Sequence, residues 1–215
     1  MLEMGGKVEQ QLQSSLNAIT AVDSGAAETI ISRDDDINQM EMAIDEECAT
    51  IIARRQPTAS DLRLVIAIIK VNTDLERIGD EAAKVARQAV RMSEEGASRS
   101  SFVEVKHIGS RVAVMLRDAL DAFARLDVQQ AVDVVKSDIE VDKEYGSAMR
   151  SLVTFMMEDP RDIGAVLNEM WALRSLERIG DHAANIAEHV VYLVRGLDVR
   201  HGGLEEMLED LTERH

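Results

Sequence analysis

Two pairs of carboxylates at identical spacing are the residues of this sequence most suited to chemistry. The hexapeptide Leu-Glu-Arg-Ile-Gly-Asp occupies residues 75–80 and returns unchanged at residues 176–181. The acidic pairs within the two copies are Glu76 with Asp80 and Glu177 with Asp181. On an α-helix a Glu and an Asp at this spacing lie on one face, where like charges repel by about 0.2–0.5 kcal/mol. We therefore expect a compensating partner, either a nearby Arg or Lys or a bound cation.

A second acidic stripe is predicted on the helix that precedes each copy of the hexapeptide. In the first half its members follow helical spacing and share one face; they are Asp34, Asn38, Glu41 and Asp45. In the second half Asp138 and Asp142 match the first two members, and the stripe ends there because Tyr145 and Met149 take the later positions. If the two acidic helices of each half are antiparallel neighbours, three or four carboxylates meet in one patch. The candidate metal ligands are Asp34, Asn38, Glu76, Asp80, Asp138, Asp142, Glu177 and Asp181, with Glu41 and Asp45 as possible additional ligands.

Oxygen ligands of this kind suit hard cations such as Mg²⁺, Mn²⁺, Ca²⁺ and ferric iron. A tetrahedral zinc site built from Cys and His is not expected, because neither residue occurs at ligand spacing, although carboxylates can also hold zinc. The alternative is a solvated acidic face balanced by nearby cations, namely Arg33, Arg77, Lys84 and Arg178. The repetition of both stripes in both halves gives the metal site as much weight as the solvated face, and the residues alone leave the two interpretations open.

The composition indicates an all-helical protein. Of the 215 residues 46% are hydrophobic and only 3% aromatic, and the chain contains two prolines. The net charge of −16 argues against nucleic acid or an anionic lipid surface as a partner. The single cysteine, Cys48, excludes an intramolecular disulfide and suits a reducing compartment. Because we see neither a signal peptide nor an apolar run of the ~20 residues that span a membrane, we expect a cytoplasmic protein.

Hydrophobic periodicity predicts six helices, three in each half. They are expected at about residues 2–22, 26–55, 58–92, 103–126, 127–157 and 159–194. Pro57 and Pro160 lie just before the two helices that carry the hexapeptide, with Thr58 and Asp159 as capping residues. The fold class is therefore all-α, with two tandem three-helix bundles related by an internal repeat. The expected divisions are a first bundle at residues 1–96, a second at 97–200 and a polar tail at 201–215 with a short helix near 204–212.

Some weaker candidates have structural interpretations. Gly79 and Gly180 lie in the middle of their helices, which suggests the close approach of a neighbouring backbone. Asn185 and His189 extend the second acidic pair along its helix, but the matching positions of the first half hold Lys and Gln, so we expect surface residues. The sequence has no Gly-rich phosphate loop, no nucleophile elbow and no Cys/His dyad, and we therefore do not expect an enzyme.

The chain resembles the PhoU family, the phosphate-signalling accessory proteins of bacteria. The resemblance extends from about residue 5 to residue 200, and it is carried by both hexapeptides and by the segments at residues 40–46, 55–63 and 156–159. It implies paired three-helix bundles, usually dimeric, with metal ions (Mg, Mn, Fe or Zn) on Glu/Asp-x-x-x-Asp motifs. These motifs fall on Glu76 with Asp80, on Glu177 with Asp181 and on Asp138 with Asp142. Asp34 fits the fourth motif, but Asn38 replaces its second acid.

The resemblance also implies a non-enzymatic regulator. Such a protein restrains phosphate uptake by the Pst transporter and helps to silence PhoR–PhoB signalling when phosphate is plentiful. The implied partners are the histidine kinase PhoR, the transporter ATPase PstB and a second copy of the chain, with the inner membrane reached through these partners.

Two other classes of function are weighed against this regulator. A di-iron oxidase of the ferritin-like type would need Glu-x-x-His pairs, but Gly79 and Gly180 stand where the histidines would be. A metal phosphohydrolase would need an open metal position in a dry pocket, which acidic stripes on the outside of a bundle do not supply. The remaining class is a plain helical scaffold whose acidic residues serve only solubility.

Overall fold

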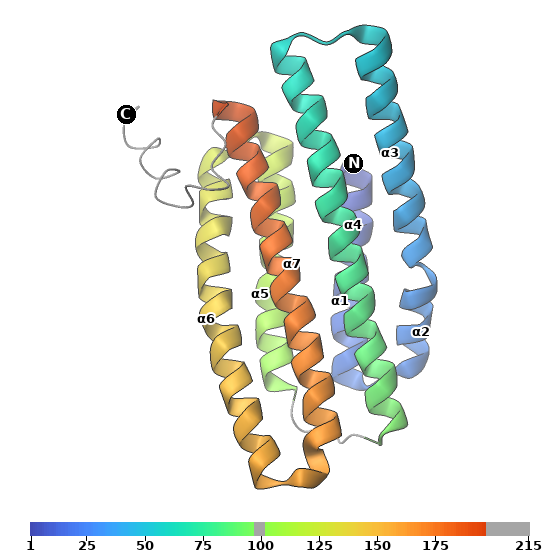
Figure 1. Ribbon diagram of the computed structural model, residues 1–215, viewed down its shortest axis with the longest axis vertical. Helices are drawn as coiled ribbons and strands as arrows, with labels where there is room; N and C mark the ends of the chain where they lie inside the picture. Colours follow the sequence, from blue (N-terminus) through green and yellow to red (C-terminus); the bar gives the residue numbers. More distant parts are fainter. Residues whose placement is uncertain (97–101, 197–215) are drawn as a thin grey trace.

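The computed structural model describes residues 1–96 and 102–196 of the chain, and within these ranges it contains helices and no strands. The helices are α1 (Leu2–Ala21), α2 (Ser24–Ser32), α3 (Asp34–Arg55), α4 (Ala59–Glu94), α5 (Val103–Arg125), α6 (Val128–Glu158), the 3₁₀ turn η1 (Pro160–Asp162) and α7 (Ile163–Arg195). The prediction of an all-α fold with two three-helix bundles is confirmed, since α1, α2–α3 and α4 form one bundle and α5, α6 and α7 form the other (Figure 1). The expected boundary at 96–97 lies at the edge of the described residues. The expected tail at 201–215, with its short helix, lies outside them.

The second predicted helix is interrupted, so the expectation of one helix over residues 26–55 is wrong. Arg33 separates α2 from α3, and its N–H donates to the carbonyls of Ile30 and Ile31, which ends α2. The first turn of α3 then consists of Asp34, Asp35 and Asp36. Three carboxylates at a helix N-terminus interact favourably with the helix dipole, which explains why a new helix starts here. The apolar periodicity continues through the break and therefore does not reveal it.

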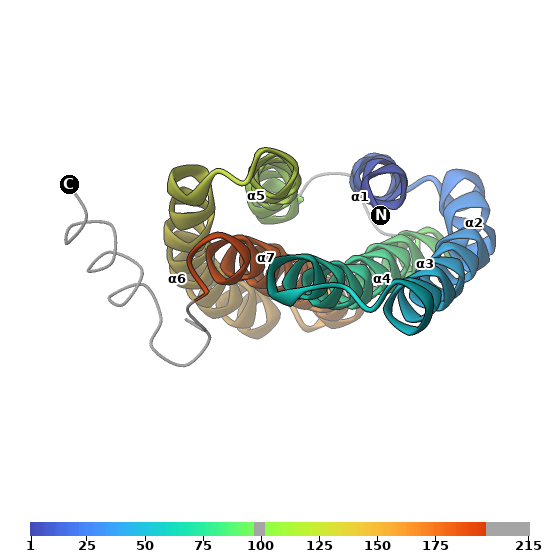
Figure 2. The same ribbon diagram turned by 90° about the horizontal axis from the view of Figure 1, so that it is seen from above.

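The two bundles share one hydrophobic core. The helices that carry the hexapeptides, α4 and α7, make the most extensive helix–helix contact and lie side by side in the centre of the molecule. Figure 2 shows α3, α4, α7 and α6 in one curved row, with α1 and α5 on the same side of that row. The buried apolar side chains form a single cluster that runs through both halves. The bundles are therefore packed as one body.

Packing between α1 and α5 shows that the halves are related by an approximate two-fold axis. A Cβ atom at Gly5 of α1 would touch the side chain of Leu120, and a Cβ atom at Gly109 of α5 would touch that of Leu16. Such reciprocal contacts are the signature of two-fold symmetry. The absence of a side chain at both glycines lets α1 and α5 approach each other closely.

The symmetry extends to the turn after the first helix of each half. Val22 and Leu126 end α1 and α5 in the left-handed conformation, with φ of 53° and 56°. The next residue in each case is an Asp whose side chain accepts a hydrogen bond at the start of the following helix, from the Ala26 N–H and from the Gln130 N–H. The repeat thus preserves the turn geometry as well as the helices.

The two predicted caps before the hexapeptide helices have different outcomes. Asp159 accepts a hydrogen bond from the Arg161 N–H at 3.0 Å, as its position predicts, although it begins η1 and not α7 directly. Thr58 occupies the N-cap position of α4 but makes no capping hydrogen bond through its side chain, so that prediction is wrong. No helix within the described ranges is both long and apolar enough to cross a membrane.

Candidate metal centres

The first acidic cluster lies between α3 and α4 and consists of Asp34, Glu76 and Asp80, and Asn38 follows Asp34 one helical turn along α3. Burial raises the pKa of the Asp34 carboxyl, and the charge of Asp80 adds to this effect. Burial also raises the pKa of Glu76, followed by repulsion from Asp80 and Glu41. The structure therefore brings Asp34, Glu76 and Asp80 into mutual electrostatic range, with Glu41 at the edge of the cluster.

Side-chain amides donate hydrogen bonds to two of the acidic residues in the first half. Gln11 of α1 donates its side-chain N–H to Asp34 Oδ1 at 2.9 Å and to the Gly79 carbonyl at 3.1 Å. Asp45, one of the possible additional ligands, accepts from Asn72 at 2.9 Å. Amide donors thus already serve two of the acidic side chains in this half.

The second acidic cluster lies between α6 and α7 and consists of Asp138, Asp142, Glu177 and Asp181. One carboxylate oxygen each from Asp142, Glu177 and Asp181 lie within 4.8 Å of one another. Within the described ranges this is the only group of three or more acidic, His or Cys side chains that approach so closely. Burial raises the pKa of both Glu177 and Asp181, and in each case a neighbouring Asp raises it further.

Asp138 is the most perturbed member of the second cluster. Burial, followed by repulsion from Asp181, Asp142 and Glu177, raises its pKa from 3.8 to about 7. Its Oδ1 atom is buried and accepts no hydrogen bond from any described residue, and the same holds for Glu177 Oε2. The cluster thus holds three crowded carboxylates and two buried oxygens that accept no hydrogen bond within the described residues. Such a set of oxygens fits the ligands that a hard cation takes.

The glycines of the two hexapeptides make room for side chains of the preceding helix, Asp138 at Gly180 and Ile37 at Gly79. A Cβ atom at Gly180 would lie 3.1 Å from Asp138 Oδ1, and one at Gly79 would lie 3.1 Å from Ile37 Cδ1 and 3.8 Å from Asp34 Oδ1. The expected close approach is therefore present, but the neighbours are side chains and not a backbone. Gly180 thus makes room for an acid of its cluster, whereas Gly79 mainly makes room for an apolar side chain.

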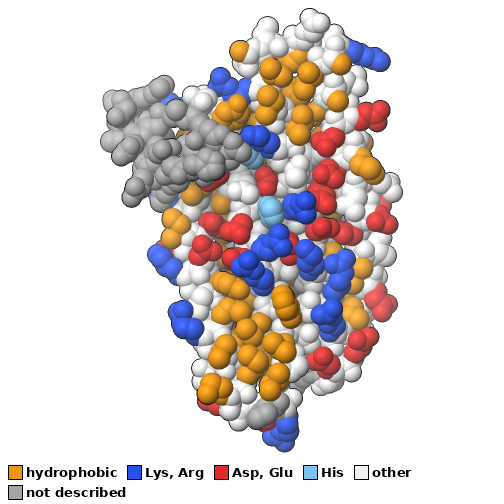
Figure 3. All heavy atoms as spheres, viewed as in Figure 1, with side chains coloured by type: hydrophobic (Ala, Val, Ile, Leu, Met, Phe, Trp, Pro, Cys, Tyr) orange, Lys and Arg blue, Asp and Glu red, His pale blue; other side chains and the backbone are white. Residues whose placement is uncertain are grey.

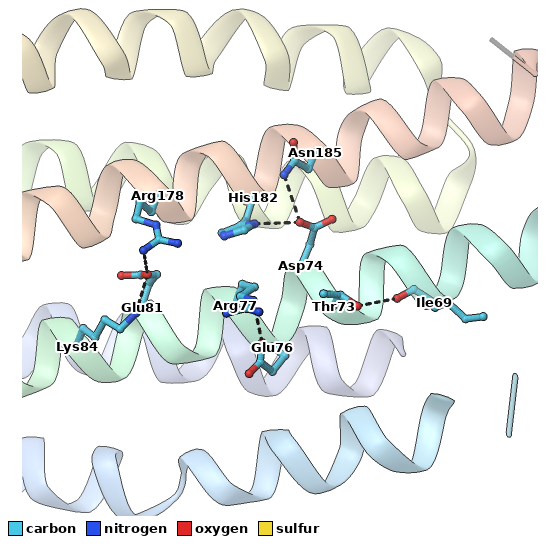
Figure 4. Close-up of polar contacts among 10 residues, drawn as sticks. All are labelled: Ile69, Thr73, Asp74, Glu76, Arg77, Glu81, Lys84, Arg178, His182 and Asn185. Atoms are coloured by element: carbon cyan, nitrogen blue, oxygen red, sulfur yellow. Dashed lines mark hydrogen bonds and ion pairs between the residues drawn. The ribbon is translucent and has the colours of Figure 1, made fainter. Parts of the chain in front are cut away.

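The cations expected to balance the acidic stripes only partly do so. Arg77 pairs with Glu76 at 3.5 Å, and Arg174 pairs with Glu177 Oε1 at 2.9 Å. Lys84 and Arg178, however, both bind Glu81, at 2.8 and 2.9 Å, and Glu81 belongs to neither cluster (Figure 4). Arg174 and Arg178 nevertheless lower the pKa of both Glu177 and Asp181, so basic side chains offset part of the repulsion in the second cluster.

A third polar group, which the sequence did not reveal, joins the two bundles. Asp74 of α4 lies 2.9 Å from His182 Nδ1 and accepts a hydrogen bond from Asn185 at 3.3 Å (Figure 4). Asp74 also lies 3.4 Å from His189 Nε2. Burial alone would raise the pKa of Asp74, but the hydrogen bonds from the two histidines outweigh it and lower the pKa. His189 is 6% exposed, so the expectation of a surface residue is wrong there, whereas Asn185 is partly exposed.

The charged groups form a band on the face of the molecule where α4 and α7 lie. Figure 3 shows acidic and basic side chains gathered near the middle of this face, with apolar side chains above and below. This charged band therefore lies over the region where the two hexapeptide helices meet.

Known proteins match this chain along nearly its whole length. The family model described as the PhoU domain matches residues 1–89 and 105–190. The chain is 61% identical over 211 residues to the phosphate-specific transport system accessory protein PhoU homolog of Pseudomonas aeruginosa, with coverage of 98% of this chain and 87% of that protein. It is 46% identical over 207 residues to the phosphate-specific transport system accessory protein PhoU of Escherichia coli strain K12, with coverage of 96% and 86%.

Two crystal structures share the fold. The chain superposes on PhoU from Pseudomonas aeruginosa with a TM-score of 0.89 at 61% sequence identity, covering 91% of this chain and 94% of that one. It superposes on the phosphate transport system regulatory protein PhoU from Streptococcus pneumoniae with a TM-score of 0.83 at 32% identity, covering 91% and 92%.

Proposed function

The chain belongs to the PhoU family, and from that premise we propose that it is a regulatory accessory protein of a phosphate-specific transport system. Its relatives are named as accessory proteins and not as enzymes, which supports a role without turnover of a substrate. We place its action in the cytoplasm, at the inner membrane through the proteins it binds. In this role it restrains phosphate uptake when phosphate is plentiful.

Metal ions are part of the proposal, and the crowded oxygens of the second cluster are the observation that carries it. Asp142, Glu177 and Asp181 would hold a hard cation such as Mg²⁺, Mn²⁺ or ferric iron, or zinc, with Asp138 beside them. When bound, the ion supplies positive charge that offsets the repulsion among these side chains. Asp34, Glu76 and Asp80 would form the corresponding site in the first half, with Asn38 as a neutral ligand.

The chain's own residues then hold the shape of the face that meets its partners. Asp74, His182 and His189 tie α4 to α7, and Arg178 reaches across the same boundary to Glu81. These contacts keep the two clusters at a constant separation on one face. We propose that this face docks on the transporter ATPase PstB and the sensor kinase PhoR, and that the protein acts as a homodimer.

Affinity capture from phosphate-replete cells tests the proposed function. The tagged chain should recover the transporter ATPase and the sensor kinase, and the double variant Glu177→Gln/Asp181→Asn should recover less of both. A matched control is Glu46→Gln/Glu47→Gln, which neutralises two exposed acids of α3 outside the clusters. If neither partner is recovered by the wild-type chain, the regulatory assignment fails. If both are recovered equally by all three proteins, the metal clusters have no part in docking.

A further inference from the structure

A pocket outside both acidic clusters lies at the end of the second bundle, where α5 begins, α6 ends and α7 begins. Its volume is about 420 Å³, and its walls include Val103, Leu152, Phe155 and Val166. Two of these apolar side chains stand open to solvent, since Val103 is 70% exposed and Phe155 is 54% exposed. The pocket therefore has an apolar wall and an apolar entrance.

A single buried carboxylate lies in this apolar wall. Glu169 lines the pocket from α7 and is only 2% exposed. Its Oε1 atom is buried and accepts no hydrogen bond within the described ranges. Burial, with a smaller contribution from Glu104 of α5, raises the pKa of Glu169 to about 7. An oxygen that is buried without a donor is unfavourable, so a ligand that supplies the donor gains binding energy from that hydrogen bond.

The internal repeat shows that the fold does not require an acid at this position. The residue of α4 that matches Glu169 of α7 is Ile68, which packs against the hydrophobic core. The first bundle therefore forms with an apolar side chain where the second has a buried Glu. The packing of the three helices therefore does not explain why Glu169 is buried at this position.

We propose that this pocket binds a lysine or arginine side chain, flanked by apolar residues, that a partner polypeptide supplies. The cationic head would donate to Glu169, and its apolar stem would lie along Leu152 and Val166. The acidic side chains around the pocket also complement such a ligand; they are Glu104, Glu158, Asp159 and Asp162. Within the described residues, Arg161 pairs with Asp159 at 2.7 Å and also interacts with Asp162, so the acidic side chains around the pocket are only partly offset.

The apolar surface around the entrance of the pocket favours a polypeptide as the occupant. Val103 and Phe155 extend the apolar area beyond the space that one cationic side chain fills. A segment with an apolar residue next to its Lys or Arg covers both, whereas a free amine covers neither. The net charge of −16 favours a basic segment as well. This site lies apart from the metal clusters, so the proposal does not depend on them.

The test is a titration of the full-length protein with a labelled peptide, acetyl-Ala-Leu-Arg-Leu-Ser-amide, and with the same peptide carrying neutral citrulline in place of Arg. We expect the Arg peptide to bind at least about tenfold more tightly than the citrulline peptide at pH 8. Its affinity should rise about tenfold from pH 6 to pH 8, because Glu169 ionises across that interval. Free butylguanidinium should bind more weakly than the peptide.

Two variants of Glu169 and one control complete the design. Glu169→Gln should remove both the preference for Arg and the pH dependence, while the charges of Glu104, Glu158, Asp159, Arg161 and Asp162 persist. Glu169→Leu should do the same, and Ile68 indicates that an apolar residue there is compatible with folding. The control Glu47→Gln, on exposed α3, should bind like the wild type.

Equal binding of the Arg and citrulline peptides would overturn the proposal, as would unchanged binding by Glu169→Gln. Butylguanidinium that binds as tightly as the peptide would overturn the polypeptide as occupant. Loss of metal from the acidic clusters should leave all these affinities unchanged, which separates this site from the proposed function.

Discussion

The two acidic clusters share one plan and differ at two positions. In both, the first acid packs against the glycine of the hexapeptide, and a Glu and an Asp follow on that helix. Asp34 accepts a hydrogen bond from Gln11, whereas the matching neighbour of Asp138 is Met115, which has no N–H or O–H to donate. The second difference is that Asn38 stands where the second half has Asp142.

These two differences change how much uncompensated negative charge each cluster carries. The first cluster has one carboxylate fewer and an amide that already serves its most buried acid. The second has four carboxylates, of which Asp138 has no donor on its Oδ1 and a pKa of about 7. Duplicated helices can therefore hold sites of unequal strength, and we infer that the second cluster binds a cation more tightly than the first.

Removing two acids from one cluster at a time should have the largest effect. Glu177→Gln/Asp181→Asn should weaken metal binding in the second half by at least about 100-fold, because substitutions that only support a ligand already weaken it by about 10- to 100-fold. Glu76→Gln/Asp80→Asn should remove only the weaker site. Elemental analysis after loading and dialysis measures both. Equal loss of metal from the two double variants would show that the two clusters do not differ in affinity.

Circular dichroism provides the control for this pair. Both variants should keep the helical signal of the wild type, because the side chains they change lie outside the shared hydrophobic core. Retention of all metal in both variants would show that the acidic stripes are a solvated face and nothing more.

Much of the fold follows from the sequence because local signals and the repeat agree. Asp23 and Asp127 cap matching helices, and Pro57 and Pro160 precede the two hexapeptide helices. The break at Arg33 was not predicted, since the apolar positions on either side of it keep helical spacing. Asp34 was assigned to the acidic stripe, although together with Asp35 and Asp36 it also marks a helix N-terminus.

The site residues that could be predicted from the sequence are mainly those whose acidic side chains recur in both halves. The acids that recur in both halves were found, and the structure brings two of them, Glu177 and Asp181, within 4.8 Å of Asp142 in the second half. Asp74 and Glu81 were missed because their matching residues are Ser175 and His182, so no repetition marks them. Gln11 was missed because its contact with Asp34 joins residues far apart in the chain.

Restoring the missing acid should make the first cluster more like the second. Asn38→Asp adds a carboxylate one helical turn from Asp34, and we expect it to tighten metal binding in the first half about tenfold, because oxygen sites strengthen with ligand charge. Calorimetric titration in the Glu177→Gln/Asp181→Asn background isolates this site. The reverse change, Asp142→Asn, should weaken the second site by a similar factor. An Asn38→Asp variant with unchanged affinity would show that this position does not face the ion.

The pH dependence of stability should distinguish Asp138 in the metal-free protein. Its pKa is raised from 3.8 to about 7, so between these values the folded protein holds a proton that the unfolded chain has released. The contribution of this proton to stability is therefore present below about pH 4 and lost as the pH rises to about 7. Asp138→Asn has no such loss and should be more stable than the wild type by about 1 kcal/mol at pH 8, after allowance for solvent screening. Urea unfolding in chelator at pH 5 and pH 8 measures the difference.

Added metal should reverse that order, because the wild type keeps a carboxylate beside the ion and the variant does not. If Asp138→Asn is less stable than the wild type at pH 8 even in chelator, the buried oxygen of Asp138 has a partner that offsets its charge.

Exchanging Gln11 and Met115 should give the smallest effect and the most direct test of the comparison. Met115→Gln would place an amide donor beside Asp138 and lower its pKa, and Gln11→Met would remove the donor from Asp34 and raise its pKa further. Gln11→Met removes the donor to the Asp34 carboxylate and to the Gly79 carbonyl, and Met115→Gln adds a donor to Asp138. We expect stability shifts of about 0.5–1 kcal/mol, with Met115→Gln stabilising the metal-free protein at pH 8 and Gln11→Met destabilising it. Carbon-detected NMR titration of the Asp carboxyls reads the two pKa values directly. Carboxyl titrations that do not respond to either change would mean that crowding alone, and not the donor from α1 or α5, sets the difference between the halves.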